Sequence, residues 1–148
     1  MIPAFNGFSY LKKHLPVITR LGADQIIIVD DASTDGTGQF LKTEYPNIVV
    51  ITHPKNLRFP KSVNDGFAHA TGEVVILLNQ DLLPSPDLLK HALSHFKDPD
   101  IFAVTFAERQ RSWADGAWND GFLEFKNGAR FPLEAEGFSH SEISGSSV

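Results

Sequence analysis

The sequence predicts an α/β fold in which a mostly parallel sheet is flanked by helices. Three apolar runs rich in β-branched residues, at 26–29, 48–51 and 74–78, have the uninterrupted pattern of strands buried on both faces. Stretches with helical spacing of apolar residues separate these runs. Such an alternation favours parallel strands joined by right-handed crossovers.

Composition limits the class of protein. The 148 residues are 42% hydrophobic and 21% charged, and no apolar run approaches the ~20 residues of a membrane-spanning helix. The net charge of −5, with no basic stretch, argues against nucleic acid as a partner. The lack of cysteine excludes disulfides and thiolate zinc sites. We therefore expect no transmembrane segment and a cytoplasmic location, with the inner face of the membrane as the alternative.

The expected domain organisation follows from the length of the chain and from a change in sequence pattern after residue 108. We expect a single domain over 1–148, with an α/β core at 1–108 and an insert at 109–148. Residues 1–5 predict a strand that the Asn6-Gly7 turn ends early. We therefore expect this domain to be incomplete at its first strand and at its other end.

Two adjacent carboxylates follow the strand at 26–29. Asp30 and Asp31 lie at its carboxyl end, where open parallel sheets bind ligands. Residues 33–35 offer side-chain oxygens to the free amides of a helix at about 36–45. Because adjacent carboxylates repel each other, they need a positive or hydrogen-bonding partner. This need favours a functional site here.

Helices are predicted on either side of the strand at 48–51. An amphipathic helix over 8–20 bends near Pro16, and another helix over 60–70 has Pro60 in its first turn. The expected buried face of this second helix holds Val63, Phe67 and Ala70.

The strand at 74–78 leads into Asn79-Gln80-Asp81. Ser85-Pro86-Asp87 then predicts a helix start, with Ser85 as N-cap and Pro86 at the first helical position. Residues 101–106 predict a further strand of the same sheet. Alternation around an Asn-Gly pair predicts a β-hairpin at 122–132.

Three predicted strand ends meet at one edge of the sheet: Asn6, Asp30-Asp31 and Asn79-Gln80-Asp81. A hard divalent cation takes oxygen ligands and neutralises a nucleotide diphosphate, and Asp81 is the natural ligand for it. Positive charge for the same pocket is available from Arg58 and Lys61.

Four sequence blocks occur in order over residues 2 to about 96. They are Ile2-Pro3-Ala4-Phe5-Asn6; Val29-Asp30-Asp31-x-Ser33-x-Asp35-x-Thr37; Asn56-x-Arg58-Phe59-x-Lys61-x-Val63-Asn64-x-Gly66; and Ala70-Thr71-Gly72-Glu73 leading to Leu77-Leu78-Asn79-Gln80-Asp81. In this combination and spacing they resemble the inverting family 2 glycosyltransferases of the GT-A fold. The resemblance implies a Rossmann-like GT-A domain with a β-hairpin insertion.

The resemblance also assigns site residues. It implies that Pro3, Ala4 and Asn6 line the base and ribose of a nucleotide and that Asp31 accepts a hydrogen bond from the base. Lys61 and Asn64 lie near the base or the diphosphate, Asn79 faces the ribose, and Asp81 binds Mg²⁺ or Mn²⁺. Asn79 departs from the family's Asp-x-Asp pattern, which removes one charge.

The implied reaction is a metal-assisted, inverting displacement. A nucleoside diphosphate sugar, with a UDP- or dTDP-sugar favoured, donates its sugar to a hydroxyl of a glycan or lipid-linked acceptor, as in polysaccharide biosynthesis. The family's catalytic base lies beyond this sequence, so the catalytic residue is unknown. We therefore expect a chain that carries mainly the donor-binding half.

Two alternatives stay open at this point. A non-catalytic nucleotide-binding module needs the same sheet and the same Asp31 but no base. A receiver-like signalling domain shares the doubly wound sheet, but its phosphoacceptor position holds Asn79, which cannot be phosphorylated.

Overall fold

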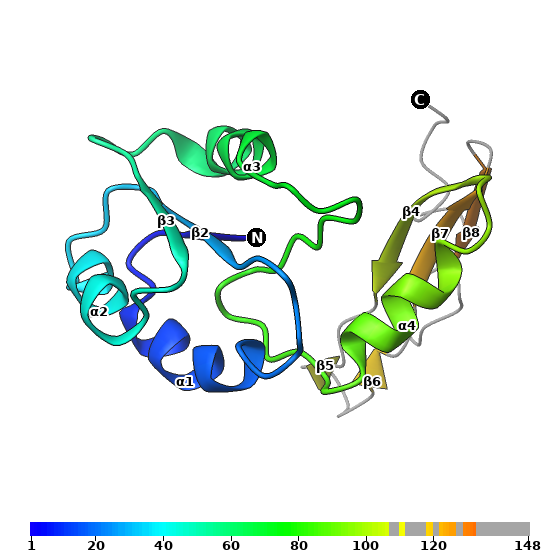
Figure 1. The fold of residues 1–148 in the computed structure, drawn as a ribbon, viewed down its shortest axis with the longest axis horizontal. Coiled ribbons are helices and arrows are strands. Elements are labelled where there is room, and N and C mark those ends of the chain that lie inside the picture. Colours follow the sequence, from blue (N-terminus) through cyan, green and yellow to red (C-terminus); the bar gives the residue numbers. More distant parts are fainter. Residues whose placement is uncertain (107–109, 112–117, 120–121, 127–128, 133–148) are drawn as a thin grey trace. The chain divides into compact units, whose positions relative to one another are not determined.

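The computed structural model describes residues 1–106, 110–111, 118–119, 122–126 and 129–132 (Figure 1). The chain forms two compact units, Met1–Leu89 and Lys90–Val148, and each is described by itself. The expected single domain, with its core at 1–108, stays a prediction.

The first unit contains a three-stranded parallel sheet. Its strands are β1 (Ile2–Ala4), β2 (Ile27–Asp30) and β3 (Val49–Thr52), in the order β1-β2-β3. All four residues of the central strand β2 are buried. The predicted parallel sheet is confirmed for these three strands. Their last residues pair in register, so their carboxyl ends meet at one edge.

The predicted strand at 74–78 is wrong as a regular strand, because this segment has no strand conformation. It nevertheless lies along the start of β1. The Met1 amine donates to the Ile76 carbonyl at 2.7 Å, and the Leu78 amide donates to the Met1 carbonyl at 3.0 Å. These two bonds match one step of a parallel ladder. Both bonds are made by Met1, the residue before β1, so they form a single step of pairing.

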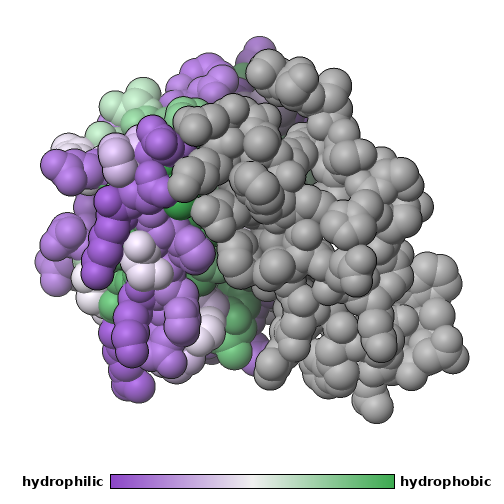
Figure 2. Space-filling view, turned by 90° about the vertical axis from the view of Figure 1, so that its right-hand side faces the viewer, coloured by the Kyte–Doolittle hydropathy of each residue, from purple (hydrophilic) through white to green (hydrophobic). Residues whose placement is uncertain are grey.

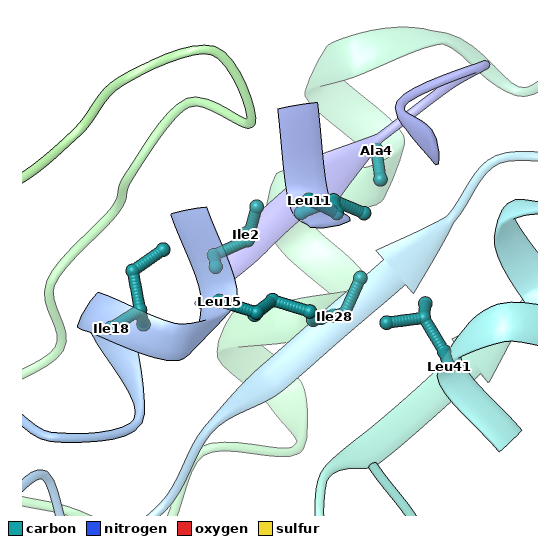
Figure 3. Close-up of a cluster of buried hydrophobic side chains, with 7 residues drawn as sticks. All are labelled: Ile2, Ala4, Leu11, Leu15, Ile18, Ile28 and Leu41. Atoms are coloured by element: carbon teal, nitrogen blue, oxygen red, sulfur yellow. The ribbon is translucent and has the colours of Figure 1, made fainter. Parts of the chain in front are cut away.

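Helices α1 (Phe8–Ile18) and α2 (Thr37–Glu44) confirm the helices predicted at 8–20 and 36–45. Pro16 lies inside α1. Both helices cover one face of the sheet, and Figure 3 shows the side chains that meet there. This apolar cluster consists of Ile2, Ala4, Leu11, Leu15, Ile18, Ile28 and Leu41. The sheet and its carboxyl edge are therefore fixed by a packed core.

Helix α3 (Arg58–Ala68) lies on the other face of the sheet, against β1 and β2 (Figure 1). It packs through small residues, since its buried positions are Ser62 and Gly66. A Cβ at Gly66 would lie 3.3 Å from Val29 Cγ2, so glycine permits this close approach. The predicted buried face was wrong for Phe67, which is 48% exposed because close packing selects small side chains, whereas Val63 and Ala70 are half-buried.

The second unit is built around an antiparallel sheet. It holds all but the first two residues of α4 (Leu88–His95), together with the strands β4 (Ile101–Phe106), β5 (Gln110–Arg111), β6 (Trp118–Asn119), β7 (Phe122–Lys126) and β8 (Ala129–Pro132). The strands pair in the order β4-β7-β8, and β5 pairs with β6. The predicted strand at 101–106 is confirmed, but it pairs antiparallel with β7 rather than joining the parallel sheet. The β7–β8 pairing confirms the hairpin.

Helix α4 begins at Leu88, three residues after the predicted N-cap. The Ser85 hydroxyl accepts a hydrogen bond from the Asp87 amide at 3.3 Å, and its carbonyl accepts one from the Leu88 amide at 3.0 Å. Ser85 therefore closes a turn that precedes the helix.

The surface of the described residues is mostly hydrophilic from the side shown in Figure 2, with smaller hydrophobic patches between polar side chains. Across the described part of the chain, no helix combines the length and the apolar character that crossing a membrane requires.

Leu15 is fully buried in this apolar cluster. We expect Leu15→Ala to lower the free energy of unfolding by about 2–5 kcal/mol, because the substitution leaves a cavity that the fixed sheet cannot close. Urea unfolding followed by far-ultraviolet circular dichroism measures this change. Lys13→Ala, at an exposed position of the same helix, should change it by less than about 0.5 kcal/mol. Equal effects of the two substitutions would contradict this packing.

Candidate functional site

A pocket of about 460 Å³ opens at the carboxyl edge of the parallel sheet, within the first unit. Its walls come from the end of β1, the residue after β2, the start of α3 and the segment after residue 78. The lining residues are Pro3, Ala4, Phe5, Asp31, Asn56, Arg58, Phe59, Ser62, Asn79, Gln80 and Asp81. Segments distant in sequence thus form one cavity where the strand ends meet, as the sequence predicted.

Asp31 is the buried carboxylate of this pocket, with only 4% of its surface exposed. Its Oδ1 accepts hydrogen bonds from His53 Nδ1 at 2.7 Å and from the Leu57 amide at 2.7 Å. Its Oδ2 accepts one from the Arg58 amide at 2.8 Å. Burial alone would raise the pKa of Asp31, but these hydrogen bonds outweigh burial and lower the pKa. The side chain is therefore an ionised acceptor at neutral pH.

His53 lies buried between two carboxylates. Its Nδ1 faces Asp31, and its Nε2 lies 2.9 Å from Asp65 Oδ2. Asp65 also forms an ion pair with Lys61, and hydrogen bonds from Lys61 and His53 lower the pKa of Asp65. This chain of contacts ties the pocket carboxylate to helix α3.

The adjacent residue Asp30 serves a different part of the fold. Asp30 is buried, and its Oδ1 accepts a hydrogen bond from the Ser33 amide at 3.1 Å. Its Oδ2 lies 2.9 Å from where a Cβ at Gly38 would stand, which places it beside α2. Successive side chains of a strand point to opposite faces, so Asp31 turns toward α3 instead. This alternation separates the two carboxylates whose repulsion the sequence had raised.

Asn6 forms hydrogen bonds with the loop after β2 and is not among the residues that line the pocket. Its Oδ1 accepts a hydrogen bond from the Thr34 amide, and its own amide donates to Ser33 Oγ, both at 2.9 Å. Asn6 also has a positive φ of 49°, which asparagine tolerates better than most residues. Its predicted contact with a nucleotide stays a prediction.

Asp35 supplies the helix-end acceptor that the sequence predicted within 33–35. Its Oδ1 accepts hydrogen bonds from the amide and the hydroxyl of the first residue of α2, at 3.1 and 2.6 Å. Its Oδ2 accepts one from the first amide of α1 at 2.9 Å. One carboxylate therefore accepts hydrogen bonds from the first residue of both helices of this face, whose N-cap residues are glycines without a capping side chain. The other two residues of the run bond to Asn6, so their predicted capping of α2 was wrong.

Gln80 fixes the pocket wall that the segment after residue 78 forms. Its side-chain amide bonds to the backbone of Phe5 twice, since Oε1 accepts from the amide at 3.0 Å and Nε2 donates to the carbonyl at 3.2 Å. Its own carbonyl accepts a hydrogen bond from His14 Nδ1 at 3.1 Å. A Cβ at Gly7 would lie 2.2 Å from Oε1, so a side chain at position 7 would displace the Gln80 amide from this arrangement. These contacts position Asn79 and Asp81 at the pocket.

The acidic residue on this wall is Asp81, which is exposed. Across the described residues, no cluster of three or more histidine, cysteine or acidic side chains is placed to hold a metal ion. The pocket instead offers the Asp81 carboxylate and the Asn79 amide oxygen, both hard donors. Mg²⁺ and Mn²⁺ fit such a partial set, because they take their remaining ligands from water and substrate phosphates.

The structure brings five of the eight predicted binding residues to one cavity, namely Pro3, Ala4, Asp31, Asn79 and Asp81. The other three, Asn6, Lys61 and Asn64, are exposed and are not among its lining residues. Their predicted roles stay predictions.

Two aromatic side chains of the pocket were missed from the sequence. Phe5 is 45% exposed and Phe59 is 53% exposed, although both are large apolar residues. The position of Phe5, between a buried strand and a turn, was the available signal. Exposed aromatic faces at a cavity suit stacking against a planar ring.

The pH dependence of stability should report the ionised state of Asp31. Its lowered pKa stabilises the fold above the unfolded value of 3.8, and that stabilisation is lost as pH falls through the folded value. We therefore expect wild type to exceed Asp31→Asn in free energy of unfolding by a constant margin from pH 7 to 5. Below about pH 4 the margin should shrink.

Urea unfolding at pH 7, 5, 4 and 3 measures this margin. The matched control is Asp24→Asn, an exposed carboxylate outside the pocket, which should give no such margin. A margin for Asp31→Asn that stays unchanged at pH 3 would contradict the assignment.

Comparison with solved structures gives the fold. A mannosyltransferase from Pyrobaculum calidifontis, in complex with GDP-Man and Mn²⁺, superposes with a TM-score of 0.65 at 23% sequence identity, covering 74% of this chain and 34% of its own. S. aureus TarS in complex with UDP gives a TM-score of 0.64 at 23% identity, covering 78% of this chain and 36% of its own. The expected GT-A fold is confirmed, and this chain spans about a third of each neighbour's length.

Comparison with protein families gives the identity. The sequence model described as glycosyl transferase family 2 matches residues 1–145, almost the whole chain. The receiver-like alternative is thereby wrong. The resemblance seen in the four sequence blocks is confirmed, and the chain belongs to glycosyl transferase family 2.

Proposed function

We propose that this pocket binds the nucleoside diphosphate of a sugar donor and that the chain is the donor-binding part of a glycosyltransferase. One observation carries the proposal: a buried ionised carboxylate, Asp31, and an exposed carboxylate, Asp81, line the same cavity at the strand ends of a GT-A fold. The first suits a neutral hydrogen-bond donor, and the second suits a cation.

Asp31 can select the base through the one acceptor position of its carboxylate that no hydrogen bond of the protein occupies. An ionised carboxylate offers about four acceptor positions, and two on Oδ1 and one on Oδ2 are occupied. The remaining position on Oδ2 suits a ring N–H. Uracil and thymine have one at N3 and guanine at N1, whereas adenine and cytosine present a ring acceptor. UDP- and dTDP-sugars remain the favoured donors, with GDP-sugars compatible.

The rest of the nucleotide has matching groups. The exposed ring of Phe5 offers a stacking surface for the base, and Pro3 and Ala4 line the same wall. Asn79 offers hydrogen bonds to the ribose. Two neighbours support a nucleotide ligand by their own contents, because one holds GDP-Man and the other UDP.

Asp81, with Asn79 beside it, would hold Mg²⁺ or Mn²⁺ together with the diphosphate. When bound, the ion neutralises the negative charge that develops on the departing nucleoside diphosphate. Asp31 orients the base, and the Gln80 contacts to Phe5 keep Asp81 in place. The acceptor hydroxyl would then displace the diphosphate at the anomeric carbon with inversion. The acceptor, a glycan or lipid-linked sugar, and the catalytic base are not assigned to residues here.

Nucleotide titration by calorimetry tests this proposal. UDP, dTDP and GDP are titrated into the purified chain with and without Mn²⁺. We expect metal-dependent binding of at least one of them, and Asp81→Asn should weaken it at least about tenfold, because the ion loses its protein carboxylate. Without Mn²⁺ the variant and wild type should bind alike.

The matched control is Asp24→Asn, which removes one exposed carboxylate outside the pocket and should leave binding unchanged. The proposal is overturned if the folded chain binds none of the three nucleotides in Mn²⁺, or if binding ignores both the metal and Asp81. Sugar transfer by a longer chain, measured against binding, then separates the enzyme from a non-catalytic nucleotide-binding module.

A further inference from the structure

Arg58 has a backbone conformation that arginine rarely adopts. Its φ is +74°, in the left-handed region where a Cβ is crowded and glycine is favoured. It is also the first residue of helix α3. A non-glycine residue in this conformation persists only where its surroundings enforce it, and such residues gather at functional sites.

The surroundings that enforce the conformation are the pocket's own groups. The Arg58 amide donates to Asp31 Oδ2 at 2.8 Å and to Asn56 Oδ1 at 3.1 Å. The preceding amide, that of Leu57, donates to Asp31 Oδ1. His53 in turn fixes the Asp31 carboxylate. Glycine at position 58 would make the two contacts of residue 58 without strain, since both of them use its backbone amide.

The distinctive part of Arg58 is therefore its side chain. Arg58 is exposed and lines the pocket, and it is the one cationic residue among the pocket's described lining residues. No ion pair engages its guanidinium within the described part of the chain, whereas Lys61 is held by Asp65. The pocket also carries Asp31 and Asp81, in a chain of net charge −5. An anion entering this cavity needs a positive partner.

We propose that the Arg58 guanidinium binds the diphosphate of the nucleotide donor and that the hydrogen bonds of Asp31 to the Leu57 and Arg58 amides hold the strained backbone in place for this purpose. Guanidinium groups bind phosphate oxygens through paired, charge-assisted hydrogen bonds. This inference rests on the proposed function and deepens it, because it names the group that neutralises the diphosphate from the protein side.

Three substitutions separate charge from strain. Arg58→Gly removes both, Arg58→Gln removes the charge and keeps the strain, and Arg58→Lys keeps the charge. Each is titrated with the best-binding nucleoside diphosphate of UDP, dTDP and GDP, and with the matching nucleoside. Lys42→Gln, which removes an exposed cation of α2 that does not line the pocket, is the control.

We expect Arg58→Gly and Arg58→Gln to lose at least about tenfold in affinity for the diphosphate and less than about twofold for the nucleoside. Arg58→Lys should retain most of the affinity. The melting temperature of Arg58→Gly should equal or exceed that of Arg58→Gln, because glycine removes the backbone strain. The loss of affinity in Arg58→Gly is then not caused by unfolding. Arg58→Gln binding the diphosphate like wild type, or an equal loss for the nucleoside, would overturn the inference.

Failure of the proposed function would look different. In that case the wild-type chain binds no nucleoside diphosphate at all. Titration with inorganic pyrophosphate then decides the role of Arg58 by itself: binding that Arg58→Gln abolishes supports an anion site, and its persistence in that variant, or its absence in wild type, overturns it.

Discussion

One buried carboxylate organises the pocket. Asp31 follows the central strand. Its carboxylate accepts hydrogen bonds from the Leu57 and Arg58 amides and from the His53 ring. These donors belong to the loop that leads from β3 into α3, so a single side chain fixes how that loop and helix meet the sheet. Leaving several buried donors without an acceptor is expensive, and a neutral amide in place of Asp31 cannot accept as many hydrogen bonds.

Other hydrogen bonds between side chains and backbone hold the segments near the cavity together. Side-chain hydrogen bonds of Gln80 join the segment after residue 78 to Phe5, which follows β1. The Asn6 side chain accepts a hydrogen bond from the loop after β2. These bonds replace strand pairing beyond the point where the parallel ladders end. The pocket walls are consequently set before any ligand arrives. Such preorganisation is what a site for a flexible nucleotide needs, because each wall contact then costs less ordering on binding.

Local patterns predicted the elements and the place of the site. Uninterrupted apolar runs located β2 and β3, helical spacing located α1 and α3, and polar residues after strands placed Asp31 and Asp81 at one edge. Each of these inferences needs only short-range periodicity and the geometry of parallel sheets.

Long-range contacts were beyond the sequence pattern. Nothing local indicates that His53 contacts Asp31, that Gln80 bonds to Phe5, or that β4 pairs with β7, since each depends on how separate segments pack. The Lys61–Asp65 ion pair was also not predicted, although its i,i+4 spacing on a helix was a local signal for it. The strain at Arg58 is also invisible in sequence, as it arises from the amide contacts to Asp31.

The most direct test of the account is to locate Mn²⁺ by its paramagnetic effect on amide resonances of the isotope-labelled chain, with and without the nucleoside diphosphate that binds. The account predicts selective broadening at residues 79–81 that requires the nucleotide, with shifts at the Leu57 and Arg58 amides on binding. Broadening centred elsewhere in the chain, or the same broadening without nucleotide, would contradict a donor site built on Asp31 and Asp81.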